Sequence, residues 1–349
     1  MKIWQVPIEP LEERYSKQWT EWFEQEFVNL GVEFTTIKGE ILSTKIRQGS
    51  FLDVIGTNFY KACQLKSLCG LLENGFIKDD DVILLHDGWF PGIEMLAYIR
   101  DALDLKFKIY AIFHAGTYDP WDFLTQKGMR KWGKYIERSW LEFIDGIFVA
   151  SKFHKNLILQ GSYETLSFAD GSFATLANKI HVTGLPIYPD FVQPDAHKEN
   201  IIVFPHRLDP EKQPEMFQKL RSELVKRRDF GWIMTNTKTL CTTKQQYYNL
   251  LNKAKISVSC ALQETWGIAM QESVMCGCIP IVPNRLSYQE LYPAVFRYDS
   301  YEELIEKVEY FTKTSGEGIE SLRLEILKNQ FIKMGAEAIP NMVKILKEK

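Results

Sequence analysis

The chain has 349 residues, of which 45% are hydrophobic, and this length is more than one hydrophobic core usually serves. A formal net charge of −3 excludes a global attraction to nucleic acid or to anionic membranes, although a local patch could still bind either. No stretch reaches the roughly 18 continuous apolar residues that span a bilayer, and the N-terminus lacks the apolar run of a secretion signal. We therefore expect a soluble, cytoplasmic protein of two domains with no integral membrane association.

Short apolar runs rich in β-forming residues alternate with longer helical patterns through the N-terminal half. These runs are 2–8, 32–39, 81–87, 107–114, 146–151 and 179–184. They are apolar on both faces, as parallel strands covered by helices on each side are. The pattern predicts a Rossmann-like α/β domain over residues 1–186.

The alternation of apolar runs and helical patterns is interrupted by a stretch that contains Pro186, Pro189 and Pro194, and it continues after this stretch. The new runs are 200–206, 230–237, 255–261 and 278–283. They predict a second Rossmann-like domain over residues 187–330, with the proline stretch as the linker. Residues 301–349 show no strand signal, and a C-terminal helix over 331–349 is a candidate to pack back toward the N-terminal domain.

The most informative segment runs from Ser259 to Pro280. A strand is predicted to end near Leu262, Glu264 falls in the following loop, Gly267 opens a helix and Glu272 lies within that helix. In an open α/β sheet, ligands bind outside the carboxyl ends of strands. A glycine at a helix start lets backbone N–H groups approach a phosphate. Two carboxylates beside it would accept hydrogen bonds from sugar and ribose hydroxyls.

This segment resembles the Glu-x7-Glu motif of retaining GT-B glycosyltransferases, the broad family of the glycogen and sucrose synthases. The likeness extends upstream to residues 203–217, VFPHRLDPEKQPEMF. It implies an α/β GT-B architecture, with two Rossmann-like domains facing across a cleft, and transfer of a sugar from a nucleoside-diphosphate sugar with retention at the anomeric carbon. Carried over by position, the donor-binding residues are Arg207, Lys212, Glu264, Trp266, Gly267, Ile268 and Glu272.

The resemblance also assigns roles within this set. Glu264 would contact the donor sugar, Glu272 the nucleotide ribose, and Arg207 and Lys212 the diphosphate. Fixed cations can stabilise a departing nucleoside diphosphate without a metal, so we expect a metal-independent enzyme with no cofactor. In such retaining enzymes the leaving phosphate takes the acceptor's proton, and a dedicated protein base can be absent.

The N-terminal half matches the family only loosely. Relatives have a glycine-rich loop after the first strand, whereas residues 7–16 contain no glycine. His86-Asp87 and His114 each end a predicted strand, and the family places a histidine like His114 close to the donor sugar. We therefore predict His114, Asp87 and Glu264 as catalytic residues. The alternative for His86 and His114 is a purely structural role, in which each ring is hydrogen-bonded to the local backbone. The resemblance makes residues 1–186 the acceptor-binding domain, and the predicted acceptor-binding residues are Arg14, Tyr15, His86, Trp89 and Tyr118.

A closer likeness narrows the acceptor. The segments 204–217 and 263–293 resemble enzymes that mannosylate queuosine in tRNA, notably in their Pro-His-Arg, Cys-Gly-Cys and Tyr-x-Glu-x-x-Pro elements. The resemblance implies a modified base within a polynucleotide as acceptor. A phage-encoded enzyme acting in the host cytoplasm on 5-hydroxymethylcytosine in DNA would share this geometry.

Local charge is compatible with a polynucleotide acceptor, DNA or tRNA. Residues 38–66 carry five basic and two acidic side chains, and residues 127–155 carry seven basic and three acidic ones. Both segments contain aromatic residues, and basic and aromatic side chains together can follow a phosphate backbone and stack on an exposed base. The alternative is a pair of helices with solvated basic faces and aromatic core faces.

Other functions fit the same fold. A glycosyltransferase of surface polysaccharide or glycolipid synthesis would show a membrane-facing helix, for which residues 124–140 are the only candidate, with unremarkable periodicity. A nucleotide-sugar epimerase would need acid–base carboxylates and no separate acceptor. A non-catalytic nucleotide-sugar sensor would show a degraded donor site, and the complete set of donor residues argues against it.

Overall fold

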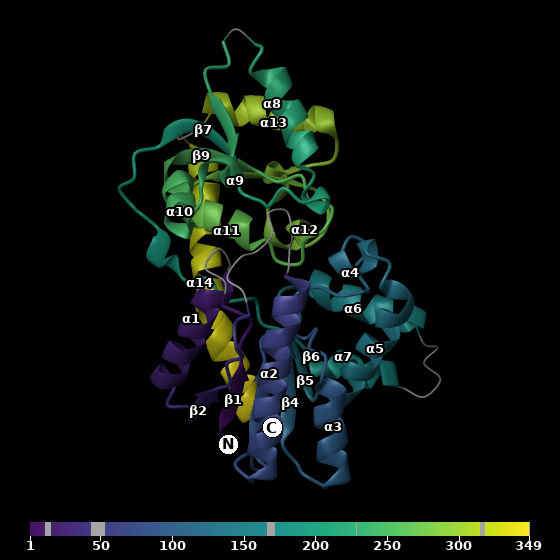
Figure 1. Cartoon of the computed structure of the whole chain (residues 1–349). Coiled ribbons are helices and arrows are strands. Elements are labelled where there is room, and N and C mark those ends of the chain that lie inside the picture. Colours follow the sequence, from purple (N-terminus) through teal and green to yellow (C-terminus); the bar gives the residue numbers. More distant parts are fainter. Residues whose placement is uncertain (11–14, 43–52, 166–171, 228, 315–317, 349) are drawn as a thin grey trace. The chain divides into compact units, whose positions relative to one another are not determined.

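The computed structural model describes residues 1–10, 15–42, 53–165, 172–227, 229–314 and 318–348 (Figure 1). The chain forms two compact units. Unit 1 comprises Met1–Gly184 and Ala338–Lys349, and unit 2 comprises Leu185–Glu337. The boundary falls directly before Pro186, at the start of the stretch predicted as a linker. Arg14, a predicted acceptor residue, lies outside the described residues.

Unit 1 is built on a six-stranded parallel sheet in the order β2-β1-β3-β4-β5-β6. Its strands are β1 (Ile3–Val6), β2 (Phe34–Thr36), β3 (Val82–Leu85), β4 (Lys108–Ile112), β5 (Gly146–Val149) and β6 (Ile180–Val182). Each coincides with one of the predicted apolar runs. The prediction of a Rossmann-like sheet in this half is confirmed.

Helices cover both faces of this sheet. They are α1 (Tyr15–Asn29), α2 (Val54–Glu73), α3 (Ile93–Ala102), α4 (Phe123–Gln126), α5 (Arg130–Phe143), α6 (Lys152–Thr165) and α7 (Ser172–Lys179). Side chains of α3 and α5, such as Leu96 and Trp140, share one core with Ile83 and Leu85 of β3. On α1, the ring of Phe23 packs against His86, directly after β3. Successive residues of a strand point to opposite faces, and β1, β3 and β5 are buried at every position, so these three strands are covered on both sides.

Unit 2 has a five-stranded parallel sheet in the order β11-β10-β9-β7-β8. Its strands are β7 (Glu199–Phe204), β8 (Ile233–Asn236), β9 (Ala254–Val258), β10 (Ile279–Pro283) and β11 (Arg297–Tyr298). The four predicted runs are confirmed, whereas β11 was not predicted because two residues carry no periodic pattern. Strand β9 ends at Val258 and not near Leu262, because the amide of Leu262 bonds to the carbonyl of Glu211, 2.7 Å away, instead of continuing the ladder.

The helical segments of unit 2 connect these strands. They are η1 (Pro189–Phe191), η2 (Pro210–Lys212), α8 (Pro214–Leu224), α9 (Thr237–Leu240), α10 (Lys244–Lys253), α11 (Ile268–Met275), α12 (Tyr288–Leu291), η3 (Ala294–Phe296) and α13 (Tyr301–Thr314). The last helix, α14 (Ile319–Lys347), begins in unit 2, and its final turns belong to unit 1. Across the described part of the chain, no helix is both long enough and apolar enough to cross a bilayer.

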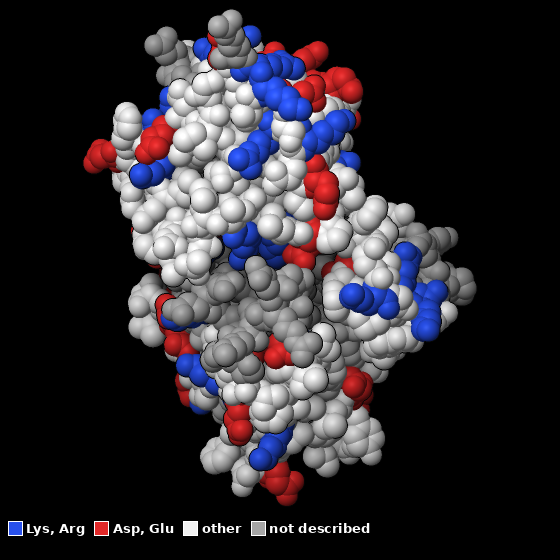
Figure 2. Space-filling view, turned by 45° about the horizontal axis from the view of Figure 1, so that its top comes forward, with Lys and Arg blue, Asp and Glu red and all other residues white. Residues whose placement is uncertain are grey.

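Helix α5 shows a clear division between its faces, so the prediction of unremarkable periodicity for residues 124–140 is wrong. It buries Gly133, Glu137 and Trp140, which recur at helical spacing, and exposes Trp132 and Tyr135. The periodicity was missed because two of the buried residues, Glu137 and Arg138, are charged. Figure 2 shows Lys and Arg side chains gathered on the lobe of unit 1 that α4 and α5 form, at the right of the view.

The buried acid of α5 makes a pH-dependent contribution to stability. Burial raises the pKa of Glu137 to about 8, against the lowering effect of its bonds from the Thr117 hydroxyl and amide. An acid with a raised pKa in the folded state stabilises the fold fully below its ordinary pKa and loses that contribution as pH rises through the folded pKa. We therefore expect the free energy of unfolding to fall between about pH 4.5 and 8. Asp122, whose pKa burial raises to about 7, adds to the same slope.

Urea denaturation at several pH values checks this expectation on the Glu137→Gln variant. A glutamine keeps an oxygen acceptor for Thr117 but has no proton to lose, so the slope of stability against pH should become shallower. The matched control is Glu142→Gln, which lies on the same helix with a half-exposed side chain. An equal slope in the wild type and the Glu137→Gln variant would contradict the assignment.

Candidate active site

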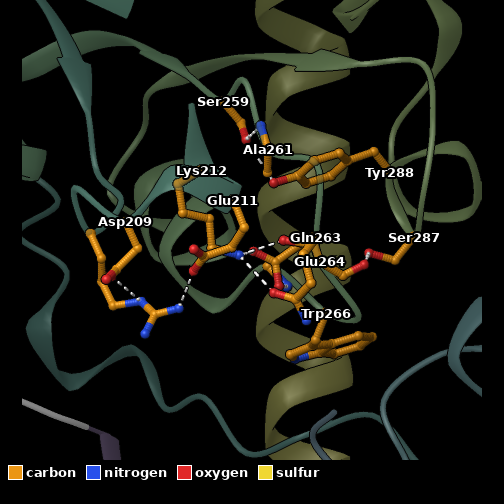
Figure 3. A network of polar contacts seen from close by, with 12 residues as sticks. Asp209, Glu211, Lys212, Ser259, Ala261, Gln263, Glu264, Trp266, Ser287 and Tyr288 are labelled. Carbon is orange, nitrogen blue, oxygen red and sulfur yellow. Dashed lines mark hydrogen bonds and ion pairs between the residues drawn. The ribbon is translucent and has the colours of Figure 1, made fainter. Parts of the chain in front are cut away.

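The loops after β7 and β9 bring a lysine and a glutamate together in unit 2. Lys212, in the short helix η2, is buried, and its Nζ donates to the carbonyl oxygen of Gln263 at 2.5 Å and to Oε2 of Glu264 at 3.3 Å (Figure 3). The other carboxylate oxygen of Glu264 accepts a hydrogen bond from the amide of Gly267 at 2.9 Å. The carboxylate is therefore fixed between a buried cation and the start of α11.

These partners keep Glu264 charged. Burial alone would raise the pKa of its carboxyl, but the cation of Lys212 and the Gly267 amide together hold it below its usual range. A charged carboxylate accepts hydrogen bonds only, which suits the hydroxyl groups of a sugar.

Two buried polar groups beside this arrangement have no partner among the described residues. They are Nε2 of His206 and Nε1 of Trp266. Burial, followed by the charge of Lys212, lowers the pKa of His206 to about 3, so the ring is neutral. Buried polar groups nearly always have partners, so orphaned ones at the end of a strand point to a ligand. Trp266 was predicted as a donor residue, whereas His206 was present in the motif without a predicted role.

Arg207 lies half-buried after β7 and has acidic neighbours on its own loop. Its Nη2 is 2.7 Å from Oε1 of Glu211, and its Nε is 3.4 Å from Oδ2 of Asp209. These carboxylates hold the guanidinium in place and offset part of its charge. A diphosphate bound here would compete with Asp209 and Glu211 for the same donors.

Glu272 is buried in α11 and is surrounded by donors from α10. Its Oε1 accepts from Nζ of Lys244 and from the hydroxyl of Tyr248, both at 2.9 Å, and its Oε2 accepts from the hydroxyl of Tyr247 at 2.7 Å. No feature of the sequence linked these three residues to Glu272. A ribose hydroxyl donating to this carboxylate would have to share or replace one of these partners.

Gly267 holds the N-terminus of α11 in a conformation that favours glycine. Its φ is +77°, and a Cβ added there would lie 3.3 Å from Tyr288 and 3.5 Å from Glu264. We expect Gly267→Ala to lower the free energy of unfolding by roughly 1 kcal/mol and to weaken nucleotide binding, because the left-handed backbone strains alanine and Tyr288 must shift to admit the methyl group, which disturbs the start of α11.

Gly231→Ala is the matched control for Gly267→Ala. Gly231 also has a positive φ of +58°, but a Cβ there meets nothing within 4 Å. Urea denaturation should show a loss of stability in both variants, and nucleotide titration should show weaker binding only in Gly267→Ala. Equal nucleotide affinity in the two variants would contradict a site at the start of α11.

In unit 1, His114 lies two residues after the end of β4, and two of its polar contacts orient the ring. Its Nε2 is 2.7 Å from the carbonyl oxygen of His86, which can only accept, so Nε2 carries a proton. Its Nδ1 lies 3.4 Å from the hydroxyl of Tyr15 at the start of α1. Burial lowers the pKa of His114, although the nearby Asp87 opposes this shift. The neutral ring therefore has Nδ1 as its acceptor.

Asp87 forms an ion pair with Lys61, a residue for which the sequence predicted no role. Nζ of Lys61, on α2, lies 2.6 Å from Oδ2 of Asp87 and also donates to the carbonyl oxygen of Trp89 at 2.6 Å. Burial would raise the pKa of Asp87, but the cation of Lys61 outweighs it and lowers the pKa below its usual range. Asp87 is thus a charged hydrogen-bond acceptor and a weak base.

The other predicted acceptor residues divide into two groups. Tyr15 lies beside His114, whereas the side chain of His86 is only 1% exposed beneath Phe23. His86 therefore reaches this site through its main-chain carbonyl, which differs from the predicted side-chain contact because the aromatic ring of α1 covers the imidazole. Trp89 packs edge-to-face on a tryptophan of α5, and the hydroxyl of Tyr118 bonds to a histidine of α6 at 2.9 Å.

Comparisons with known proteins agree with this fold. A sucrose-phosphate synthase from Thermosynechococcus elongatus superposes with a TM-score of 0.68 at 11% identity, covering 100% of this chain and 98% of that one. An α,α-trehalose-phosphate synthase (UDP-forming) from Burkholderia vietnamiensis gives the same TM-score, identity and coverage. Both are GT-B glycosyltransferases, so the predicted GT-B fold is confirmed.

Sequence similarity to a curated protein is limited to part of the chain. The tRNA-queuosine alpha-mannosyltransferase of Drosophila melanogaster is 34% identical over 104 residues, which are 30% of this chain and 24% of that protein. The match thus spans about a quarter of the relative's length. No protein-family model matches the chain.

Proposed function

We propose that this chain is a glycosyltransferase that moves a sugar from a nucleoside-diphosphate sugar to an acceptor hydroxyl. The observation that carries the proposal is the bonded series Lys212, Glu264 and Gly267 at the start of α11. It combines a fixed cation, a charged carboxylate and a helix N-terminus, which are groups that recognise a sugar diphosphate. The GT-B fold supports the same function, because the similar solved structures are sugar-transferring enzymes.

In the proposed reaction, the bond between the anomeric carbon and the diphosphate oxygen breaks, and the acceptor oxygen bonds to that carbon on the same face. Arg207 and Lys212 stabilise the charge of the leaving diphosphate, and its oxygen takes the acceptor's proton. Glu264 positions the sugar, and Glu272 binds the ribose. These fixed cations supply the charge stabilisation that a metal would otherwise provide. The retention of configuration rests on the likeness of the Glu264–Glu272 spacing to retaining enzymes.

We infer that the acceptor is a modified base within a polynucleotide, either tRNA or DNA, the latter including 5-hydroxymethylcytosine in phage DNA. The sequence likeness to a tRNA-queuosine alpha-mannosyltransferase supports this inference. His114, Asp87 and Tyr15 offer such a base hydrogen-bonding groups at the ends of β3 and β4. A polynucleotide acceptor also suits a protein that acts in the cytoplasm.

The test is transfer of labelled sugar from a panel of nucleotide sugars onto bulk tRNA, DNA containing hydroxymethylcytosine, and unmodified DNA. Wild type is compared with Glu264→Ala, Arg207→Ala and the surface variant Lys333→Ala, which replaces an exposed lysine of unit 2. We expect label on one polynucleotide with wild type and Lys333→Ala, and little label with the two site variants.

Two other results would change the proposal. Hydrolysis of a donor without labelled polynucleotide would keep the donor site and move the acceptor to glycans or lipids. Interconversion of one nucleotide sugar into its epimer, without transfer, would assign an epimerase of the same fold.

A further inference from the structure

The two basic segments seen in the sequence differ once the chain is folded. In residues 38–66, Lys61 is buried against Asp87, and Lys45 and Arg47 lie outside the described residues. In residues 127–155, four cations follow one another at the start of α5. They are Lys127, Arg130, Lys131 and Lys134. No acidic residue lies between Phe123 and Ile136, so this stretch is a concentrated positive charge.

A surface pocket opens beside this stretch. It encloses about 280 Å³ of empty space, part of it open to solvent. Its wall includes three cations, Arg130, Lys134 and Arg138, and the hydroxyl of Ser162, while the hydroxyls of Thr117 and Tyr118 in the same wall are bonded to Glu137 and to His154. Arginine and lysine side chains with hydroxyl groups form typical sites for phosphate oxygens.

The one carboxyl group in the pocket wall, that of Glu137, does not repel a bound anion. Glu137 is 3% exposed, its Oε2 accepts from the amide of Thr117 at 2.8 Å, and its Oε1 has no hydrogen-bond partner among the described residues. Burial raises the pKa of Glu137 to about 8, so the protonated carboxyl predominates at neutral pH, and in that form it is a hydrogen-bond donor that does not repel an anion. An orphaned buried oxygen in a wall of cations is the second sign of a ligand here.

Exposed aromatic rings lie next to the cations on the same helix. Trp132 is 44% exposed and Tyr135 is 52% exposed, and Nζ of Lys134 lies 4.9 Å from the centre of the Tyr135 ring. Planar aromatic side chains between cations suit single-stranded nucleic acid, because the rings stack on bases while the cations meet the backbone.

We propose that the α5 pocket and the exposed side chains of Lys131, Trp132 and Tyr135 form the surface on which the phosphate backbone of a polynucleotide acceptor docks. This proposal rests on the proposed function, which it deepens by naming where the acceptor binds. The loop that follows β4 links the surface to the acceptor site, because Thr117 lies three residues after His114. Three residues of chain span at most about 11 Å, so a phosphate in the pocket lies within a few nucleotides of a base at His114.

A membrane surface is the alternative partner for a basic, aromatic helix. The pocket favours the polynucleotide, because a recess whose wall holds three cations fits a discrete phosphate better than a flat layer of headgroups. Ile136 is the one exposed aliphatic residue of α5 among the large hydrophobic ones, so the helix has little to insert into acyl chains.

The experiment measures binding of the full chain to fluorescent tRNA and single-stranded DNA over a range of salt concentrations. The variant Lys131→Glu/Lys134→Glu reverses two charges on α5, and Trp132→Ala removes one ring. Lys66→Glu is the matched control, with an exposed lysine of the same unit on α2. Donor hydrolysis is measured in every variant, and vesicles of phosphatidylcholine with about one third phosphatidylserine form the membrane arm.

We expect the double variant to bind polynucleotide at least roughly tenfold more weakly and to show a salt dependence reduced by about two phosphate contacts. Trp132→Ala should weaken binding roughly fivefold or more, whereas Lys66→Glu should bind as wild type does. Donor hydrolysis should stay unchanged throughout, because the donor residues lie in unit 2.

Three outcomes would overturn the proposal. The first is equal polynucleotide binding by wild type and the double variant, and the second is an equal loss in Lys66→Glu. The third is binding of wild type to the anionic vesicles but to neither polynucleotide, which would assign a membrane surface. Absence of donor hydrolysis in wild type would instead count against the proposed function, while loss of binding in the double variant would still support the docking surface.

Discussion

Replacing Lys212 with alanine is expected to lower the rate of sugar transfer by roughly 100-fold to 1,000-fold at saturating donor. The ammonium group is fixed by the carbonyl of Gln263 and lies 3.3 Å from Glu264, so no reorganisation is needed when charge develops on the leaving diphosphate. Its loss removes that stabilisation and also leaves the buried carboxylate of Glu264 without its cation. The effect should therefore appear in kcat and not only in KM.

The measurement is the steady-state release of nucleoside diphosphate, with and without acceptor. Lys226→Ala, on the exposed surface of unit 2, is the matched control and should keep the wild-type rate. Circular dichroism of Lys212→Ala shows whether the fold persists, since a buried partner has been removed. A folded Lys212→Ala variant with a rate within about threefold of wild type would contradict the role given to this lysine.

Replacing Lys61 with methionine is expected to lower the free energy of unfolding by about 3 kcal/mol. The substitution leaves Asp87, 27% exposed, without the cation that lies 2.6 Å from it. Breaking a buried ion pair from one side is costly because the remaining charge has lost its partner, whereas replacing both members can be nearly neutral. The double variant Lys61→Met/Asp87→Asn should therefore recover most of the lost stability.

Urea denaturation of the two single variants and the double variant forms a double-mutant cycle for this pair. Lys66→Met removes a lysine from the exposed face of the same helix and should change stability by less than about 0.5 kcal/mol. A Lys61→Met variant as stable as Lys66→Met would mean that the pair contributes nothing to the fold. Loss of transfer activity by Asp87→Asn, in a variant that remains folded, would separate a functional role of the carboxylate from its structural one.

The strands could be predicted from the sequence because parallel strands buried on both faces are continuous apolar runs. The start of α11 could also be predicted, since Gly267 has the positive φ that its place before a helix indicated. Strand β11 and the early end of β9 could not, because two residues show no period and the amide of Leu262 turns to a distant carbonyl.

The ion-pair partners of the site residues could not be predicted from the sequence. Lys61 pairs with Asp87, and Lys244 with Glu272, across stretches of chain that no motif connects. Such pairs depend on how helices pack on the sheet, which a single sequence does not reveal. The amphipathic character of α5 could not be predicted for a related reason. Glu137 is an acidic residue, which a sequence pattern places on the exposed face, whereas the fold buries it.

Calorimetric titration of UDP, GDP and ADP into wild type, Arg207→Ala, Lys212→Ala and Lys333→Ala tests the donor site at the start of α11. We expect at least one nucleoside diphosphate to bind wild type and Lys333→Ala with equal affinity and to bind the other two variants at least roughly tenfold more weakly, since each loses a charged contact to phosphate. Binding of no nucleoside diphosphate to wild type, or equal binding to all four proteins, would contradict a donor site at the start of α11.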